Sequence, residues 1–187
     1  EADAREERMT AYLASVERDL CDTLRHGTRP TAGMVESVAA AKVSAVDEAI
    51  EYCHRLRQEV GSYALMAGTG FEHTDFLQCC KFAEGDSRIL LMKVARDRVK
   101  AHGDRVRKGA AVPAWMSAGE AAAVAKLAEA LAESASGGKR PAEAWETHWD
   151  KAYTTARLAV DNIVSRRVGG PEKWSNAGWR STPASRL

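Results

Sequence analysis

Few features of this sequence place it in a specialised class of protein. Aromatic residues make up 6% of its 187 residues, and only five prolines and four cysteines occur. The 27 basic and 26 acidic residues nearly balance, which excludes the strong field typical of nucleic-acid-binding proteins. No apolar run approaches the roughly 20 residues that span a bilayer. We therefore expect no nucleic-acid partner and no membrane span.

Cysteine and histidine show neither the pattern of a metal site nor that of a disulfide framework. None of the cysteines belongs to a CxxC motif, and the five histidines fall at no metal-binding spacing. We expect no metal, and reduced, mostly buried thiols of the kind found in intracellular proteins. These thiols are Cys21, Cys53, Cys79 and Cys80.

Apolar residues recur in steps of three and four along most of the chain, which is typical of amphipathic helices. No stretch shows the sustained alternation of a strand. The sequence therefore predicts an all-α fold, an antiparallel helical bundle with a helical C-terminal extension and an extended tail. The expected main helices cover residues 5–26, 32–66, 87–102, 117–136 and 142–167.

The same pattern suggests a division of the chain. Residues 1–103 form a first helical unit, 104–113 a linker, 114–168 a helical hairpin and 169–187 a tail. Ser117 and Glu120 have the spacing of a capping box, which predicts the start of the hairpin.

Residues 82–87 place one carboxylate, Glu84, in a turn that opens directly onto a helix. Gly85 permits backbone angles that a Cβ would forbid, and Asp86 or Ser87 can cap the helix that follows. A carboxylate held there could remove a proton from a substrate. Alternatively, Glu84 simply benefits from the positive end of the helix dipole. Spacing alone leaves both interpretations open.

Residues from about 5 to 100 resemble part of the C-terminal helical domain of the acyl-CoA dehydrogenases and acyl-CoA oxidases. One matching segment is AAAKVSAVDEAIEYCHRLRQEVGSYAL, similar to a family segment with an Ala-Lys pair, a Gln and a GGxGY turn. Gln58 and Gly61 align with that Gln and the first glycine. The other match is EGD at 84–86, where the dehydrogenases carry EGT and the oxidases EGD. The oxidase form is the closer match.

The resemblance implies a chemistry for these residues. In such enzymes the Glu of this turn removes the α-proton of a fatty acyl-CoA, while FAD takes a hydride from the β-carbon. Carried over, Glu84 is the catalytic base. Gln58 and Gly61 lie along the FAD, and Gly85 and Asp86 shape the turn beside it.

Two hypotheses follow from the resemblance. In the first, the chain is the C-terminal part of an FAD-dependent acyl-CoA dehydrogenase or oxidase. It is inactive alone, because the family's N-terminal and middle domains have no counterpart in it. In the second, it is a non-catalytic structural or assembly subunit derived from that domain. Trp174 and Trp179 favour the second, since their polar tail offers no core and aromatic side chains are enriched at protein interfaces. We expect both to bind another protein chain.

The last three residues, Ser185-Arg186-Leu187, are similar to the peroxisomal address of the S-K-L type. They predict a peroxisomal protein. The start at Glu1 instead of Met would alternatively fit removal of a mitochondrial or plastid transit peptide.

Overall fold

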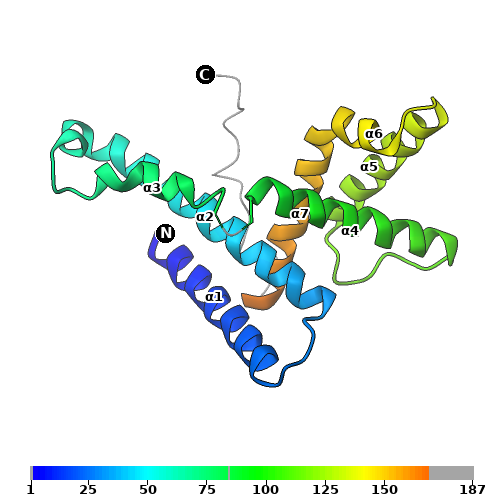
Figure 1. The fold of residues 1–187 in the computed structure, drawn as a ribbon, viewed down its shortest axis with the longest axis horizontal. Coiled ribbons are helices and arrows are strands. Elements are labelled where there is room, and N and C mark those ends of the chain that lie inside the picture. Colours follow the sequence, from blue (N-terminus) through cyan, green and yellow to red (C-terminus); the bar gives the residue numbers. More distant parts are fainter. Residues whose placement is uncertain (1, 84, 169–187) are drawn as a thin grey trace.

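All regular secondary structure of this chain is helical. The computed structural model describes residues 2–83 and 85–168, and over these ranges it contains α-helices and 3-10 helices but no strand (Figure 1). This confirms the all-α prediction. The elements are α1 (Ala2–Arg25), α2 (Ala32–Val60), η1 (Gly61–Leu65), η2 (Phe71–His73), α3 (Thr74–Cys79), α4 (Ser87–Arg107), α5 (Ala118–Ser136), α6 (Pro141–Thr147) and α7 (Trp149–Val168).

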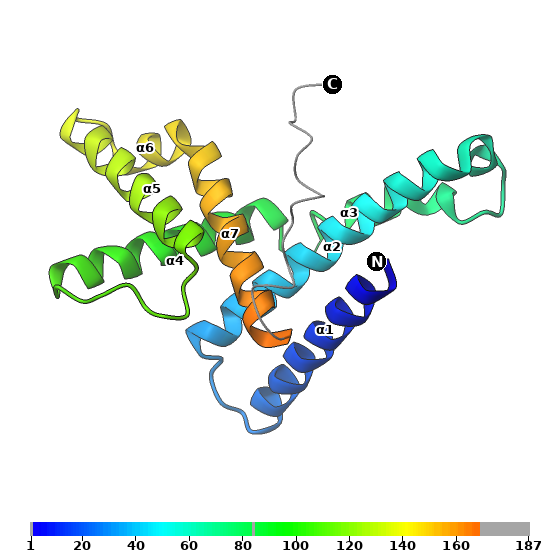
Figure 2. The same ribbon diagram turned by 180° about the vertical axis from the view of Figure 1, so that it is seen from behind.

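The hydrophobic core lies where α7 crosses the other helices. α7 contacts α1, α2, α4, α5 and α6, and Figure 2 shows it in orange between α2 and the pair α4 and α5. Small side chains at these contacts let the backbones approach closely. They include Ala39, Ala40, Ala41, Ala152, Ala156 and Ala159, all buried. Residues on both sides of the predicted linker therefore contribute to one core.

Helices α1 and α2 run antiparallel and are joined by the short loop 26–31 (Figure 1). Tyr12 of α1 is fully buried between them, and its hydroxyl donates a hydrogen bond to the Ser37 carbonyl at 2.9 Å. Burial raises the pKa of Tyr12 to about 12, so this hydroxyl keeps its proton and remains a donor at neutral pH.

A buried polar cluster joins α2, α4, α5 and α7. Arg98 donates from Nε to Glu120 Oε1 at 2.6 Å and from Nη1 to Glu36 Oε1 at 2.7 Å. Asn162 Nδ2 donates to the other oxygen of Glu120 at 2.7 Å. Glu120 is 0% exposed, so these partners replace the water that its carboxylate would otherwise need. The polar groups of the cluster thus specify how four helices meet.

The predicted end of α4 is wrong. The helix continues through Gly103 to Arg107, where the sequence predicted a linker. An interior glycine costs roughly 1 kcal/mol relative to alanine, but the residues after it add local support. Arg107 pairs with Asp104, and Arg105 Nη2 lies 3.2 Å from His102 Nδ1. These contacts keep residues 103–107 helical.

The long helix predicted for residues 142–167 is divided into α6 and α7 at His148. This residue has φ −111° and ψ 29°, outside the helical region. Its ring Nε2 lies 2.9 Å from Ser134 Oγ of α5, and this contact holds the break against the neighbouring helix. The His148 N–H still donates to the Ala144 carbonyl at 3.1 Å, so the chain turns without losing that bond.

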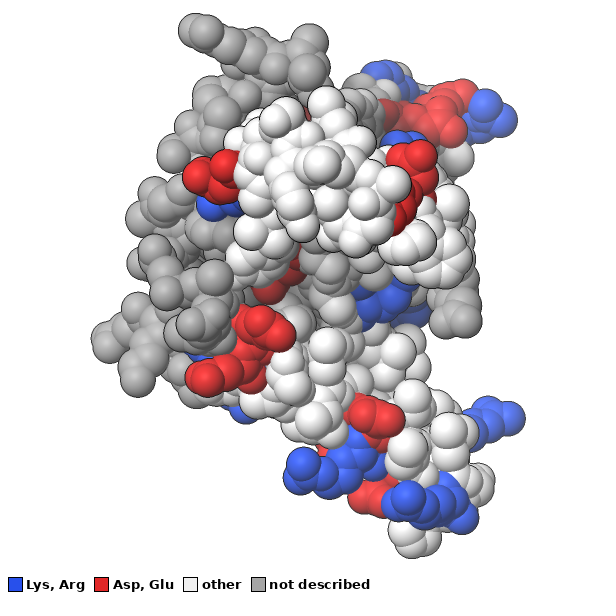
Figure 3. Space-filling model, turned by 90° about the vertical axis from the view of Figure 1, so that its left-hand side faces the viewer, with Lys and Arg blue, Asp and Glu red and all other residues white. Residues whose placement is uncertain are grey.

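The second half of α2 leaves the core. The buried residues of α2 all lie between Ala39 and Val43. Beyond the contact of Asp47 with Arg157 of α7, α2 extends with η1, η2 and α3 away from α7, and both ribbon views show α2 and α3 side by side (Figures 1 and 2). We call residues 44–80 the arm. Seen from the arm's side, a largely uncharged surface has charged residues at its margin (Figure 3).

Candidate functional site

The turn predicted to be catalytic is held against α2 by one lysine. Lys42 Nζ donates to the Lys81 carbonyl at 2.8 Å, to the Gly85 carbonyl at 2.5 Å and to Ser87 Oγ at 3.1 Å. An ammonium group has three donors, so these acceptors use all of them. The bonds reach the chain on both sides of position 84. Lys42 therefore fixes the backbone that flanks the predicted base.

Glu84 itself lies outside the described residues, and its role stays a prediction. The residues before it are held in a hydrogen-bonded turn, in which the Ala83 N–H donates to the Cys79 carbonyl at 3.1 Å. The residues after it begin α4. The local scaffold on each side of the predicted base is thus defined by backbone hydrogen bonds.

Gly85 and Asp86 have the local roles that the sequence predicted. Gly85 has φ +104°, a conformation that L side chains rarely adopt. A Cβ at this position would meet the Leu90 side chain at an ordinary 3.8 Å, so conformation and not space requires the glycine. Asp86 is the N-cap of α4, and its Oδ1 accepts from the Arg88 N–H at 2.7 Å.

Gln58 and Gly61 lie elsewhere, at the far end of α2. The Gln58 side chain is exposed, and its Nε2 lies 3.3 Å from the Nε2 of His54. Gly61 ends the α-helix with φ +55°, and no atom lies within 4 Å of the position where a Cβ would be. This glycine explains why the helix predicted to residue 66 ends at Val60 and continues as a 3-10 turn.

The structure does not bring the four predicted cofactor residues together. Helix α2 is continuous from Lys42, beside the turn, to Gln58. At 1.5 Å per residue this separation amounts to roughly 24 Å along the helix axis. Gly85 and Asp86 therefore form one end of the candidate site, and Gln58 and Gly61 mark a second position on the arm.

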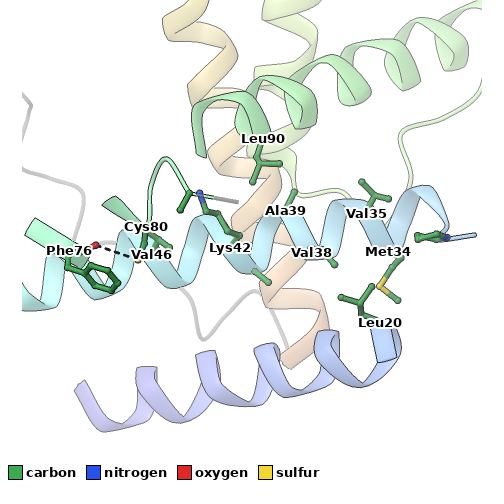
Figure 4. Close-up of a pocket in the computed structure, with 13 residues that line it drawn as sticks. Leu20, Met34, Val35, Val38, Ala39, Lys42, Val46, Phe76, Cys80 and Leu90 are labelled. Carbon is green, nitrogen blue, oxygen red and sulfur yellow. Dashed lines mark hydrogen bonds between the residues drawn. The ribbon is translucent and has the colours of Figure 1, made fainter. Parts of the chain in front are cut away.

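An apolar groove of about 790 Å³ runs along α2 and ends at the turn. Ala83 and Lys42 line it at the turn, and Figure 4 shows Leu90 of α4 and Phe76 of α3 on the same side of α2. Its volume lies within the range of about 300–1,000 Å³ typical of small-molecule sites. Further lining residues are Leu20, Met34, Val38 and Val46.

Sequence reasoning missed the role of Lys42, which it noted only as half of an Ala-Lys pair. A signal was present, because this lysine follows Ala39–Ala41 and precedes Val43 in the buried part of α2. A charged side chain within such a stretch needs a partner. The sequence alone did not reveal that the partner is a turn some forty residues later, at separations of 39 and 43 residues.

The cysteines are less buried than predicted. Cys79 is exposed and the others are half-buried, and all four are free thiols. Three of them, Cys53, Cys79 and Cys80, lie on the arm. There, α2 and α3 bury the side chains only in part. Cys53 Sγ contacts Thr74 Oγ1 at 3.3 Å, and Cys80 Sγ donates to the Phe76 carbonyl at 3.6 Å. Cys53 thus joins α2 to α3, whereas Cys80 makes a contact within the last turn of α3.

Two further classes of site find no support in the part of the chain that the structure describes. Over residues 2–83 and 85–168, His, Cys, Asp and Glu side chains form no group of three or more suited to a metal ion. No described helix combines the length and the apolar composition needed to cross a bilayer. Trp174 and Trp179, the predicted partner-binding residues, lie outside the described ranges.

Comparison with protein families, with curated proteins and with solved structures gives no match for this chain. An assignment of function therefore rests on the residues of this chain alone. The features that carry chemistry are the turn held by Lys42, the groove beside it and the exposed end of α2.

Proposed function

We propose that this chain is the C-terminal helical portion of a flavin-dependent acyl-CoA dehydrogenase or oxidase, with Glu84 as the base that removes the α-proton. The observation that carries the proposal is the binding of Lys42 to the carbonyls of Lys81 and Gly85, on both sides of that residue. A catalytic base must be held within hydrogen-bonding reach of the proton that it takes. A turn fixed at two points meets this need better than a free loop.

The groove beside the turn supports the choice of substrate. Its lining consists almost entirely of aliphatic and aromatic side chains, with Lys42 as the charged exception. Burying methylene groups is favourable by about 0.8 kcal/mol each, so a fatty acyl chain suits such a surface. We infer that the acyl chain lies along α2 with its thioester end at the turn.

FAD would supply the acceptor for the hydride. Gln58 and Gly61 fit one part of such a cofactor, because both are exposed and the space around Gly61 is open. Their separation of roughly 24 Å from the turn means that the described residues alone do not enclose a flavin. We therefore propose that the remaining contacts come from other domains or chains, and that this chain alone is inactive.

The test uses 2-enoyl-CoA formation from a saturated acyl-CoA. The isolated chain should give none, and adding the rest of the enzyme in trans should restore turnover. Glu84→Gln should abolish the restored activity, because it keeps the shape of the side chain and removes the base. Glu133→Gln, an exposed position on α5, is the matched control and should remain active. Full activity of Glu84→Gln would contradict the proposed role.

A second candidate, a non-catalytic assembly subunit, is favoured by the surface of the arm. Large apolar side chains there are exposed, including Leu65 at 80% and Met66 at 61%. Neighbouring exposed apolar side chains of this kind are typical of protein contacts. This candidate predicts that the arm and the tail, with Trp174 and Trp179, bind another protein chain.

A further inference from the structure

A second hollow, of about 360 Å³, lies on the other side of the turn and shares no lining residue with the groove. It is bounded by α2, by the residues around the start of α4 and by the first half of α7. Most of its lining side chains are charged or aromatic, whereas those of the groove are mostly aliphatic. The charged and aromatic side chains of the hollow include Asp47, Lys81, Arg88, Trp149, Tyr153 and Arg157.

Two of its cations are held in place by one carboxylate. Asp47 Oδ1 lies 3.0 Å from Lys81 Nζ, and Asp47 Oδ2 lies 3.2 Å from Arg157 Nη1. The lysine and arginine side chains are 39% and 44% exposed, so both can be reached from solvent. Lysine has three donors and arginine five, and each keeps donors available after pairing with Asp47. The pair is therefore preorganised to bind an anion.

Arg88 adds a third cation that is not neutralised within the described residues. Its side chain is exposed, and no described carboxylate forms an ion pair with it. The other acidic residue of the hollow, Asp86, is engaged by the Arg88 N–H at 2.7 Å. Among the described lining residues, cations thus outnumber carboxylates by three to two. A guanidinium group also matches the geometry of phosphate oxygens, which it can bind in a bidentate manner.

An aromatic surface stands beside these cations. Trp149 is 57% exposed and meets Tyr153 edge-on, with ring centroids 5.8 Å apart and an interplanar angle of 69°. The contact with Tyr153 positions the indole while leaving much of its surface to solvent. Exposed aromatic rings beside a basic groove stack on the bases of nucleic acids and nucleotides.

We propose that this hollow binds a nucleoside phosphate, with the base stacked on Trp149 and the phosphate bound by Arg88, Lys81 and Arg157. A simple anion would use the cations and leave the indole without a role. An uncharged aromatic ligand would leave three cations without a role. The proposal needs neither Glu84 nor the apolar groove, so it stands apart from acyl-CoA oxidation.

The first test is calorimetric titration of the whole chain with ADP, adenosine and pyrophosphate. ADP should bind, and adenosine and pyrophosphate should each bind at least tenfold more weakly. Coenzyme A, which contains an adenosine with phosphate groups, distinguishes the source of the ligand. If coenzyme A binds more tightly than ADP, the site holds the nucleotide part of a larger cofactor. If the two bind equally, the site holds a free nucleotide. Failure of both to bind at millimolar concentration would overturn the proposal.

The second test uses variants. Trp149→Ala and Arg88→Ala should each weaken ADP binding about tenfold, while Trp149→Phe retains a ring and most of the affinity. Arg25→Ala is the matched control, because Arg25 is a 73% exposed arginine on α1 that pairs with the exposed Asp22. It should leave ADP binding unchanged, and circular dichroism should show the same helical content throughout. Pyrophosphate binding as tight as ADP binding, or no effect of Trp149→Ala, would overturn the nucleoside assignment.

Discussion

At the scale of single residues, Lys42 has the largest structural role near the candidate site. It lies on α2, yet all three of its hydrogen bonds reach the turn that precedes α4. The Lys81 carbonyl also accepts from the Ser87 N–H at 2.9 Å, so Lys42 adds a second link across a turn that the backbone already closes. One side chain thus positions both the turn and the start of a helix.

Replacing Lys42 with methionine tests this role. The Lys42→Met side chain has a similar length but no donors, so the turn loses three hydrogen bonds to a charged group, although the Lys81 carbonyl keeps the Ser87 N–H. Hydrogen bonds to charged groups contribute about 1.5–3 kcal/mol, and we expect the free energy of unfolding in urea to fall by about 2 kcal/mol. Lys126→Met on α5, an exposed position, is the control and should change stability little. Equal stability of the two variants would show that the turn does not depend on Lys42.

Glu36 provides a prediction about pH. Burial raises its pKa above the usual 4.5, although Arg98 beside it acts in the opposite direction. The folded state therefore binds this proton more tightly than the unfolded state does. The resulting stabilisation is complete below about pH 4.5 and is lost as the pH rises through the higher pKa of the folded protein.

Glu36→Gln removes the titrating group and should behave accordingly. Urea unfolding at about pH 7 should show the variant to be at least as stable as the unchanged protein, because the buried charge is gone. At about pH 4 the difference should shrink, since Glu36 is then largely protonated. The opposite result would be a variant that is less stable than the unchanged chain at about pH 7, with a smaller deficit at about pH 4. That result would mean that the ionised carboxylate stabilises the fold through Arg98.

At the scale of helices, local sequence accounts for most starts and fewer ends. The helix starts at Ala32, Ser87 and Ala118 agree with the predictions to within a residue, and Thr31, Asp86 and Ser117 cap them. The ends were harder to predict, because a glycine either ends a helix or is tolerated inside it. Gly61 ends α2 with a positive φ, whereas Gly103 lies within α4. The sequence around the two glycines did not separate these outcomes.

Alanine substitutions at Gly103 and Gly109 should therefore have opposite effects. Gly103 is helical, and no atom lies within 4 Å of the position that a Cβ would occupy there, so Gly103→Ala should raise stability by about 0.5–1 kcal/mol. Gly109 has φ +62°, and Gly109→Ala should lower stability by about 1 kcal/mol. Thermal unfolding of the two variants measures both changes. A stabilising Gly109→Ala would contradict the assigned turn.

At the scale of the whole molecule, the chain has a compact region around α7 and an arm with an apolar surface. The compact region joins residues from α1 to α7 through one core. The arm carries exposed apolar residues, such as Leu56 and Leu65. A molecule of this shape has apolar surface available for partners on the arm.

The predicted tail, residues 169–187, bears on how the whole molecule assembles with a partner. Each tryptophan can bury about 150–250 Å², and a polar segment has little of its own with which to cover them. Replacing Trp174 and Trp179 together with alanine should weaken the assembly by about 2 kcal/mol or more, measured by analytical ultracentrifugation of the complex. Ser175→Ala with Ser181→Ala is the control in the same segment. Unchanged assembly in the tryptophan variant would remove the main sequence support for a partner at the tail.

The sequence by itself determined the helical class, most helix starts and the cap at Ser117, and it narrowed the cap of α4 to Asp86 or Ser87. These features depend on residues within three or four positions of one another, where periodicity and capping chemistry act. It did not determine which helix faces meet. Periodicity shows that a face is apolar but not which partner covers it, so the central place of α7 emerged only in three dimensions.

The polar contacts of the candidate sites were likewise decided by the tertiary structure. Lys42 meets Gly85 across 43 residues, and Arg157 meets Asp47 across 110. Taken alone, Lys42, Asp47 and Arg157 are ordinary charged positions on helices. Only the packing of α2 against α4 and α7 brings these groups to hydrogen-bonding distance, because such contacts depend on where distant segments of the chain come together.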